Sequence, residues 1–515
     1  MVFPAPEREC WRLNPSGLRT HARENFHRNE AIPGWAESIA MNSKPHQRQC
    51  PGPMKRRSFL EIGGLSILGL GMHDFLRYQA EAAAAGDDMR DTSVIFVWLP
   101  GGPPHMETYD MKPNAPIDYR GEFNPIHTNV PGIDVGELLP MHAKVADKFT
   151  LIRSIHHKFA DHGGGHKRLM TGRVPATPTG TVNDAPAVNT IVKKMLEDGT
   201  SKMPVCVTEV DASRASVDTF AMGPAWLGPS TTPFTVAGDP SKPGFKVQNI
   251  GVKASMETRL DDRLAMLKGL DQFRRDVDKT GAMKAMDGFN RQAIDMLMSD
   301  KVRNAFDLSK EPRKLRDRYG WNAYGQRAIL GRRLVEAGVR FVTMVWEHPH
   351  TKQPAPKYSV YNWDSHAVNC HIFKDAQWRF PCYDQALSAL IEDLYNRGLD
   401  RKVLLVATGE FGRTPRITVR RGTQTGVEQP GRDHWPRAMS VLVSGGSMKT
   451  GQIVGATNAK GEEPSVRPLT PNDLWASVYR HVGINHSHTL YDLQNRPMQI
   501  LPFGNPIEEI LPQHS

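Results

Sequence analysis

Short apolar runs alternate with segments of helical spacing from about residue 90 onward. The run Val94–Leu99 is apolar throughout and is followed by Pro100-Gly101-Gly102, which is typical of a buried parallel strand that ends in a loop. Similar runs predict further strands at Phe149–Ile152, Pro204–Val210, Val339–Trp346, Lys402–Ala407 and Ala438–Val443. Helices are predicted at Asn189–Glu197, Tyr383–Arg397 and Asn472–Val482. This alternation predicts an α/β fold with a mostly parallel sheet that is covered by helices on both faces.

The middle of the chain changes character, because charged segments of helical spacing replace the strands. These segments are Ser255–Val277, Met283–Met298 and Tyr324–Ala337. We expect a helical insertion at about 254–337, whose last helix returns to the sheet. The whole of 90–510 is then expected to form one domain with this insertion.

The N-terminal region has the features of an export signal. Residues 1–53 are polar and without periodicity, so we expect them to be disordered or to precede the true start site. Arg56-Arg57 and the apolar run Ile62–Met72 resemble a twin-arginine signal, and a small-residue segment follows them. The run is far shorter than the ~20 residues that span a bilayer. We therefore predict that 54–85 is a removable signal and no stable transmembrane anchor, and that the protein is periplasmic or otherwise exported.

Composition narrows the function classes. In 515 residues, 39% are hydrophobic and 23% are charged, which excludes a mainly disordered or collagen-like chain. The net charge of +10 is dispersed, whereas nucleic-acid binding requires a clustered basic face, so we expect no nucleic-acid partner. Five cysteines without a CxxC pair exclude a disulfide scaffold and argue against a cysteine zinc site. The motifs GxSxG, GxGxxG, HExxH and GxxxxGK are absent. The usual signatures of serine hydrolases, dinucleotide-binding enzymes, zincins and P-loop enzymes are therefore missing.

Polar clusters follow the predicted strands and supply the candidate chemistry. Their members are His105, Glu107 and Asp110; His162 and His166; Asp364 and His366; Glu410 and Arg413; and Arg432 and His434. Because ligands bind beyond the carboxyl ends of parallel strands, these clusters can converge in one pocket. Imidazole and carboxylate groups are ligands of divalent metals, and the arginines suit an anionic substrate. The alternatives are a structural role for each histidine and a salt bridge that pins a loop for each arginine.

The motifs GGPPHMETYDMKP, LMTGR, GRRLVEAGVRFV, WDSH, ATGEFGRTP and GRDHWP occur in this order and resemble the DUF1501 family. The resemblance covers about 55–505. The family is exported and belongs to the alkaline phosphatase/sulfatase superfamily. It therefore implies a three-layer α/β/α sandwich with one or two divalent metals at the carboxyl edge of the sheet.

The same resemblance implies roles for individual residues. It makes Asp364, His366 and His434 metal ligands, and Glu410 a ligand or a base. The superfamily's first strand ends in a metal-binding Asp, whereas here it ends in Leu99-Pro100. We expect His105, Glu107 or Asp110 to fill that corner if it is occupied.

The expected nucleophile is missing from the chain. Sulfatases carry Cys-x-Pro-Ser-Arg before a Leu-Thr-Gly-Arg segment, and His162 stands here at the place of that cysteine. No Ser, Thr or Cys lies between Ser154 and Thr171. We therefore expect metal-bound water to attack, since a metal lowers the pKa of water towards ~7. His162 or His166 is then a base or a second-site ligand, and a phosphorylated or sulfated His162 is the alternative.

The sequence thus predicts an exported metal-dependent hydrolase of sulfate or phosphate esters. The expected metal is zinc or calcium, and the expected substrate is an anionic small-molecule or polysaccharide ester held by Arg413 and Arg432. The alternative is a non-catalytic extracytoplasmic binding protein on a degenerate sulfatase-like scaffold.

Overall fold

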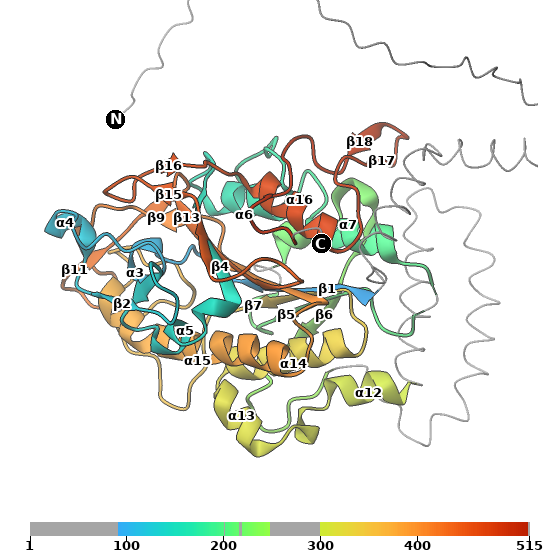
Figure 1. The fold of residues 1–515 in the computed structure, drawn as a ribbon, viewed down its shortest axis with the longest axis horizontal. Helices are drawn as coiled ribbons and strands as arrows, with labels where there is room; N and C mark the ends of the chain where they lie inside the picture. The colour runs from blue at the N-terminus through green and yellow to red at the C-terminus, as the bar shows by residue number, and fades with distance from the viewer. Residues whose placement is uncertain (1–90, 200, 216–218, 248–298, 513–515) are drawn as a thin grey trace, which may run out of the picture. The chain divides into compact units, whose positions relative to one another are not determined.

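The computed structural model describes residues 91–199, 201–215, 219–247 and 299–512 (Figure 1). The predicted extension 1–53 and signal 54–85 lie outside the described residues. The same holds for the predicted helices Ser255–Val277 and Met283–Met298. These remain predictions.

An eight-stranded sheet, in the order β14-β4-β13-β8-β1-β7-β5-β6, forms the centre of the described region (Figure 1). Its strands are β1 (Ser93–Trp98), β4 (Phe149–Ile155), β5 (Cys206–Val210), β6 (Phe234–Ala237), β7 (Phe341–Val345), β8 (Val403–Thr408), β13 (Met439–Gly445) and β14 (Gln452–Val454). β13 runs antiparallel to β4 and β8, whereas the other neighbouring pairs of this sheet are parallel. The predicted strands are confirmed, and so is the mostly parallel sheet.

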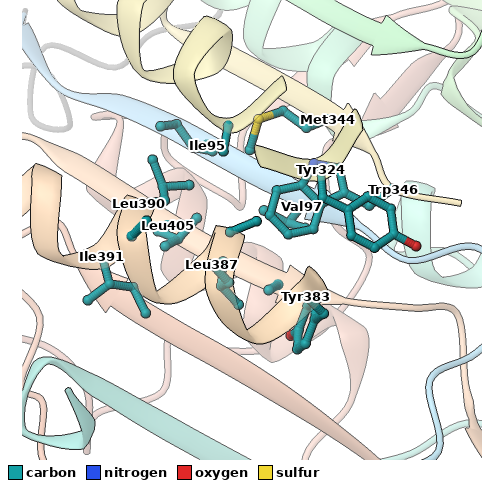
Figure 2. Close-up of a cluster of buried hydrophobic side chains, with 14 of the residues drawn as sticks. Ile95, Val97, Tyr324, Met344, Trp346, Tyr383, Leu387, Leu390, Ile391 and Leu405 are labelled. Atoms are coloured by element: carbon teal, nitrogen blue, oxygen red, sulfur yellow. The ribbon is translucent and has the colours of Figure 1, made fainter. Parts of the chain in front are cut away.

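Helices cover both faces of the sheet, as alternate residues of β1 illustrate. Val94 and Phe96 belong to one hydrophobic core, whereas Ile95 and Val97 belong to another. The covering helices are α6 (His162–Thr171), α7 (Val188–Leu196) and α16 (Pro471–His481) on the first face, and α14 (Ala323–Glu336) and α15 (Ile372–Asn396) on the second. Figure 2 shows side chains of α14 and α15 packed against β1, β7 and β8. The three-layer α/β/α arrangement is confirmed.

Helix α15 is longer than predicted. We expected it to begin near Tyr383. The structure starts the helix at Ile372 and carries it through Pro381, although a proline lacks a backbone N–H and disfavours a helix interior. Ile372, Phe373 and Phe380 are all buried, so packing outweighs the missing backbone hydrogen bond.

Short helices and two-stranded ribbons lie outside this core. They are the helices α3 (His105–Thr108), α4 (Ile117–Arg120), α5 (Pro140–Ala143), α12 (Asp300–Phe306) and α13 (Arg313–Tyr319), and the two-stranded ribbons β2 (Pro125–His127) with β3 (Asp134–Gly136), β9 (Gly412–Arg413) with β12 (His434–Trp435), β10 (Thr418–Arg421) with β11 (Glu428–Gly431), β15 (Ala456–Thr457) with β16 (Pro464–Val466), and β17 (Thr489–Tyr491) with β18 (Pro497–Gln499). Within the described ranges, no helix has both the length and the apolar character needed to cross a bilayer.

Candidate metal centre

The carboxyl ends of the parallel strands carry most of the predicted site residues. Glu410 follows β8, and α6 follows β4. Asp364 lies in the connection from β7 to α15, and His434 lies in the ribbon strand β12. Since these segments meet at one edge of the sheet, six predicted residues come together: His162, His166, Asp364, His366, Glu410 and His434.

Helix α6 presents two of these histidines on one face. Asp161 caps the helix by accepting a hydrogen bond from Gly163 N at 2.9 Å. His162 and His166 are four residues apart, so both side chains lie on the same side of the helix. Gly165 lets this helix approach Phe411 closely, because a Cβ there would lie 2.9 Å from the Phe411 ring. This glycine therefore makes room for a phenylalanine.

Three imidazole nitrogens surround the carboxylate of Asp364. His434 Nε2 lies 3.0 Å from Oδ1, and His366 Nε2 lies 3.3 Å from the same oxygen. His162 Nε2 lies 3.4 Å from Oδ2. We call these four residues the histidine corner.

The histidine corner fits a divalent metal by its hydrogen-bonding pattern. His434 Nδ1 donates to the carbonyl of Ala160 at 2.6 Å, so the lone pair of the neutral ring lies on Nε2 and faces Asp364 Oδ1. Burial lowers the pKa of His434, which favours that neutral ring. His366 Nε2 is buried without a hydrogen-bond partner, and burial lowers the pKa of His366 to about 4. Lone pairs that face a carboxylate are stabilised by a cation between them.

The spacing of the ligand atoms agrees with this interpretation. In a tetrahedral site with metal–ligand bonds of ~2.0–2.1 Å, neighbouring ligand atoms lie roughly 3.3 Å apart. The separations of 3.3 Å from His366 to Oδ1 of Asp364 and of 3.4 Å from His162 to Oδ2 match that value, whereas His434 lies closer, at 3.0 Å from Oδ1. The ligand atoms of His162, Asp364 and His434 all lie within 4.8 Å of one another, and His366 stands outside this group.

Glu410 lies at the other side of His162 and is fully buried. Its Oε1 is 2.8 Å from His162 Nδ1 and 3.0 Å from His166 Nε2, and it accepts a hydrogen bond from Gly101 N at 2.9 Å. Burial alone would raise the pKa of Glu410, but His166 and His162 hold it well below its usual range. Burial alone would lower the pKa of His162, whereas Asp364 and Glu410 raise it to about 9. His162 thus joins the two carboxylates.

Gly101 makes the approach of these segments possible. Its φ is +108°, and a Cβ there would lie 2.6 Å from the backbone nitrogen of Asp364. A glycine is therefore required where the turn after β1 touches the Asp364 loop. We did not assign this residue a role, although the Gly-Gly pair after a buried strand was a usable signal.

Two predicted ligands lie outside the cluster. His105 Nε2 is 3.1 Å from the carbonyl of Gly461, and its other ring nitrogen faces Arg413 N at 3.5 Å. Asp110 forms an ion pair with Lys112 at 2.8 Å and accepts a hydrogen bond from Thr457. The structure does not bring His105 or Asp110 into the group of candidate ligands, because short contacts around α3 engage both side chains elsewhere.

Arg413 is buried beneath the histidine corner and binds protein groups. Its guanidinium donates to Asp364 Oδ1 at 2.7 Å, to the carbonyl of Gly102 at 2.9 Å and to the carbonyl of Trp363 at 3.0 Å. The side chain has no exposed surface, so an anionic ester cannot reach it directly. These contacts match the loop-pinning alternative.

Arg432 is likewise fully buried and paired with Glu107 at 2.6 Å. It also donates to the carbonyl of Tyr119 at 2.7 Å and to that of Thr414 at 3.0 Å. Arg432 therefore ties loops together, and the structure does not support the predicted contact with substrate. The same ion pair engages Glu107, which was the third candidate, with His105 and Asp110, for a metal ligand after the first strand.

Two hydroxyl groups lie near the histidine corner in the sequence, those of Thr171 and Ser365. Thr171 Oγ1 donates to the carbonyl of Lys167 at 2.6 Å within α6. The buried Ser365 side chain lines a small cavity together with Pro104, Trp363 and Phe380, and its Oγ has no hydrogen-bond partner. Neither hydroxyl forms a hydrogen bond with the histidine corner.

The sequence analysis missed two residues that support the centre. Asn369 Nδ2 donates to Asp364 Oδ2 at 3.0 Å. His157 Nε2 donates to the backbone carbonyl of Glu410 at 2.6 Å, and burial lowers the pKa of His157 to about 4. The position of His157 just after a strand was a signal for the second of these, whereas nothing in the sequence distinguished Asn369.

Comparison with known families identifies the chain. A family profile described as "Protein of unknown function (DUF1501)" matches residues 91–511. The chain belongs to the DUF1501 family. The match confirms the resemblance on which the predicted site residues rested, and it covers the sheet, its helices and the histidine corner. No curated protein matches this DUF1501 chain in sequence.

Solved structures similar to the DUF1501 chain include sulfatases and phosphatases of the alkaline phosphatase/sulfatase superfamily. The PsFucS1 sulfatase from Pseudoalteromonas sp. is 12% identical, with a TM-score of 0.34 over 80% of this chain and 70% of the sulfatase. The lipoteichoic acid synthase LtaP from Listeria monocytogenes is 12% identical, with a TM-score of 0.36 over 81% of this chain and 78% of LtaP. A mutant of TAB5 alkaline phosphatase with Mg bound is 12% identical, with a TM-score of 0.34 over 77% of this chain and 99% of the phosphatase.

Proposed function

We propose that this DUF1501 protein is an exported, metal-dependent hydrolase of anionic esters, with sulfate or phosphate as the ester group. The observation that carries the proposal is the histidine corner, in which imidazole nitrogens of His162, His366 and His434 surround the carboxylate of Asp364. Such a set of ligands holds a divalent metal at a strand-end site.

The donor set favours zinc over calcium. Calcium takes 6–8 oxygen ligands, whereas the histidine corner supplies three nitrogens and one carboxylate. Zinc prefers nitrogen ligands, and a catalytic zinc can expand from four ligands to five, which leaves a position for water beside the four side chains. When bound, such a metal polarises an ester oxygen and lowers the pKa of water towards ~7, which is chemistry that no hydroxyl near the corner supplies.

The side chains of this protein then have distinct tasks. Arg413 positions the Asp364 carboxylate by a hydrogen bond to Oδ1, and Asn369 does so by a hydrogen bond to Oδ2. His166 is the candidate general base, because its ring reaches Glu410 from the same helix face as His162. Arg413 therefore acts through Asp364 and does not itself bind the ester.

The burial of both arginines favours a second candidate function. An enzyme of anionic esters needs exposed donors for the anion, and Arg413 and Arg432 are both fully buried in contacts with the protein. A non-catalytic binding protein with a metal at the histidine corner would need no such donors. This alternative predicts metal binding without turnover.

Metal analysis of the purified protein, coupled to a substrate panel, tests the proposal. The panel contains an aryl sulfate, a phosphate monoester and a phosphodiester, each assayed with zinc and after removal of metal by a chelator. We expect one ester class to be hydrolysed only in the presence of metal. Bound metal without turnover of any ester would support the binding protein, and turnover unaffected by the chelator would contradict both functions.

A further inference from the structure

The two carboxylates on either side of His162 have different surroundings. Asp364 is partly exposed and faces imidazole nitrogens at 3.0–3.4 Å. Glu410 is fully buried, and the backbone N–H of Gly101 donates to both of its oxygens, at 2.9 and 3.1 Å. A carboxylate that already accepts hydrogen bonds in this way has fewer lone pairs left for a metal.

The distances around Glu410 are those of hydrogen bonds. His162 Nδ1 lies 2.8 Å from Oε1, and His166 Nε2 lies 3.0 Å from the same atom. Both values fall in the range of N–H···O hydrogen bonds, and both are shorter than the roughly 3.3 Å expected between two ligands of a tetrahedral metal. Two of the three contacts of Asp364, those with His366 and His162 at 3.3 and 3.4 Å, lie at the longer value, whereas the contact with His434, at 3.0 Å, equals that between His166 and Glu410.

The tautomer of His162 connects the two sides. A neutral imidazole has one N–H and one lone pair. A metal that binds at Nε2, which faces Asp364, takes the place of the proton there and leaves the N–H on Nδ1, which donates to Glu410. A carboxylate that fixes a metal-bound histidine through its second ring nitrogen is a recurrent arrangement in metal sites.

The charges lead to the same conclusion. Asp364 and Glu410 carry two negative charges, and the buried Arg413, 2.7 Å from Asp364, carries one positive charge, so the net charge of the three is −1. One divalent ion would change the net charge to +1, whereas two ions would change it to +3 in a largely buried site. Glu107 and Asp110 offer no compensation, because each is paired with another cation.

We infer that the centre holds a single metal ion, bound by His162 Nε2, Asp364, His366 and His434, and that Glu410 is a positioning residue. In this arrangement Glu410 orients His162 and His166 and does not touch the metal. The inference rests on the metal-dependent function proposed above and adds the number of ions and the role of Glu410.

The number of bound ions tests the inference directly. Wild type, Glu410→Gln, His166→Gln and His434→Ala are each saturated with zinc, freed of excess metal and measured by elemental analysis against protein concentration. We expect one ion per chain for the first three and none for His434→Ala. Glu410→Gln should bind zinc ~10–100-fold more weakly, which is the usual effect of losing an outer carboxylate.

A spectroscopic measurement covers the case in which Glu410→Gln fails to fold. X-ray absorption of the zinc-loaded wild type counts the imidazole ligands of the metal, and the expected number is three. Two ions per chain, an average of two imidazoles per ion, or the loss of an ion from saturated His166→Gln would each overturn the single-ion arrangement.

The outcomes separate this inference from the proposed function. One ion per chain with no hydrolysis of any ester would end the hydrolase proposal and leave the single-ion centre standing. Hydrolysis by a protein that holds two ions would do the reverse. A wild type that binds no divalent metal at all would overturn both.

Discussion

The Nε2 atom of His434 lies 3.0 Å from Oδ1 of Asp364, although the two residues are 70 positions apart in the sequence. His434 is held from behind by the Ala160 carbonyl and Asp364 by Arg413 and Asn369, so neither partner depends on the other for its position. Two acceptors fixed in this way form half of a metal site, and this relationship can be tested by substitution.

Removing His434 should abolish metal binding, whereas removing nearby hydroxyls should not. His434→Ala is expected to lose both bound zinc and all ester hydrolysis. Thr171→Ala and Ser365→Ala should keep the metal and lose less than ~10-fold in rate, because neither hydroxyl forms a hydrogen bond with the centre. Elemental analysis and initial rates check this. If Ser365→Ala alone erased activity with the metal still bound, that serine would be the nucleophile.

Gly101→Ala should weaken the centre because its Cβ would meet the backbone nitrogen of Asp364 at 2.6 Å. Gly132→Ala is the matched control, since Gly132 also has a positive φ, +84°, but its Cβ would meet nothing within 4 Å. The control should show only the conformational cost of roughly 1–2 kcal/mol. Gly101→Ala should lose more stability and at least ~10-fold in zinc affinity. Equal effects of the two variants would show that the close approach does not matter.

The Glu107–Arg432 pair should behave as a structural element. Arg432→Gln leaves the buried Glu107 carboxylate unpaired, which costs about 3–5 kcal/mol in the free energy of unfolding. Adding Glu107→Gln should recover part of this loss, because the double variant no longer buries an uncompensated charge. Denaturant unfolding of both variants measures the effect. Full stability of Arg432→Gln together with a higher KM for the ester would instead indicate that Arg432 binds substrate.

Acid should destabilise the fold partly through His481, at the end of α16. Burial lowers the pKa of His481 to about 4, and its Nε2 donates to the carbonyl of Ser93 at 3.1 Å. The neutral ring is the one that the folded state favours. The contribution of His481 is therefore complete above the unfolded pKa of ~6.5 and declines as the pH falls towards 4.

His481→Gln should remove this pH dependence. Between pH 7.5 and pH 5, the wild type should lose about 2 kcal/mol more than the variant. Denaturant midpoints at the two pH values measure the difference, and all other titrating groups are common to both proteins. The exposed His127, whose side chain is 96% accessible, provides the control substitution His127→Gln, which should retain the wild-type pH dependence. Parallel curves for wild type and His481→Gln would contradict the assignment.

Export should depend on the arginine pair that precedes the apolar run. Replacing Arg56 and Arg57 together with Lys should leave the precursor in the cytoplasm, because twin-arginine export requires that pair. Cell fractionation followed by immunoblotting of precursor and mature forms checks this. A matched substitution of Arg77, outside the pair, should export normally, and normal export of the double variant would exclude this pathway.

The sequence was informative where one physical requirement dominated. Strands buried on both faces must be apolar along their whole length, so Val94–Leu99 and Lys402–Ala407 were recognisable without any structure. The gathering of Asp364 and His434 also followed from the topology, because parallel strands end at one edge of a sheet.

The sequence could not show contacts between segments that lie far apart along the chain. His105 and Asp110 follow the correct strand, but the turn at Gly101 and the short helix α3 direct them towards Gly461 and Thr457. Arg413 and Arg432, the two candidate anion-binding arginines, instead donate hydrogen bonds to backbone carbonyls and carboxylates of residues far away in the sequence. Such contacts leave no local pattern in the chain.

The groups of the histidine corner are spread from His162 to His434, so the unfolded chain has no local segment that could hold a metal in the same way. A ligand that binds only the folded state adds to the free energy of unfolding, by about 2.7 kcal/mol when its free concentration is 100 times its dissociation constant. Thermal midpoints of this protein should therefore rise with the concentration of free zinc. A twin-arginine pathway, which carries folded proteins, would select the metal from the cytoplasmic pool before the protein meets the ions outside.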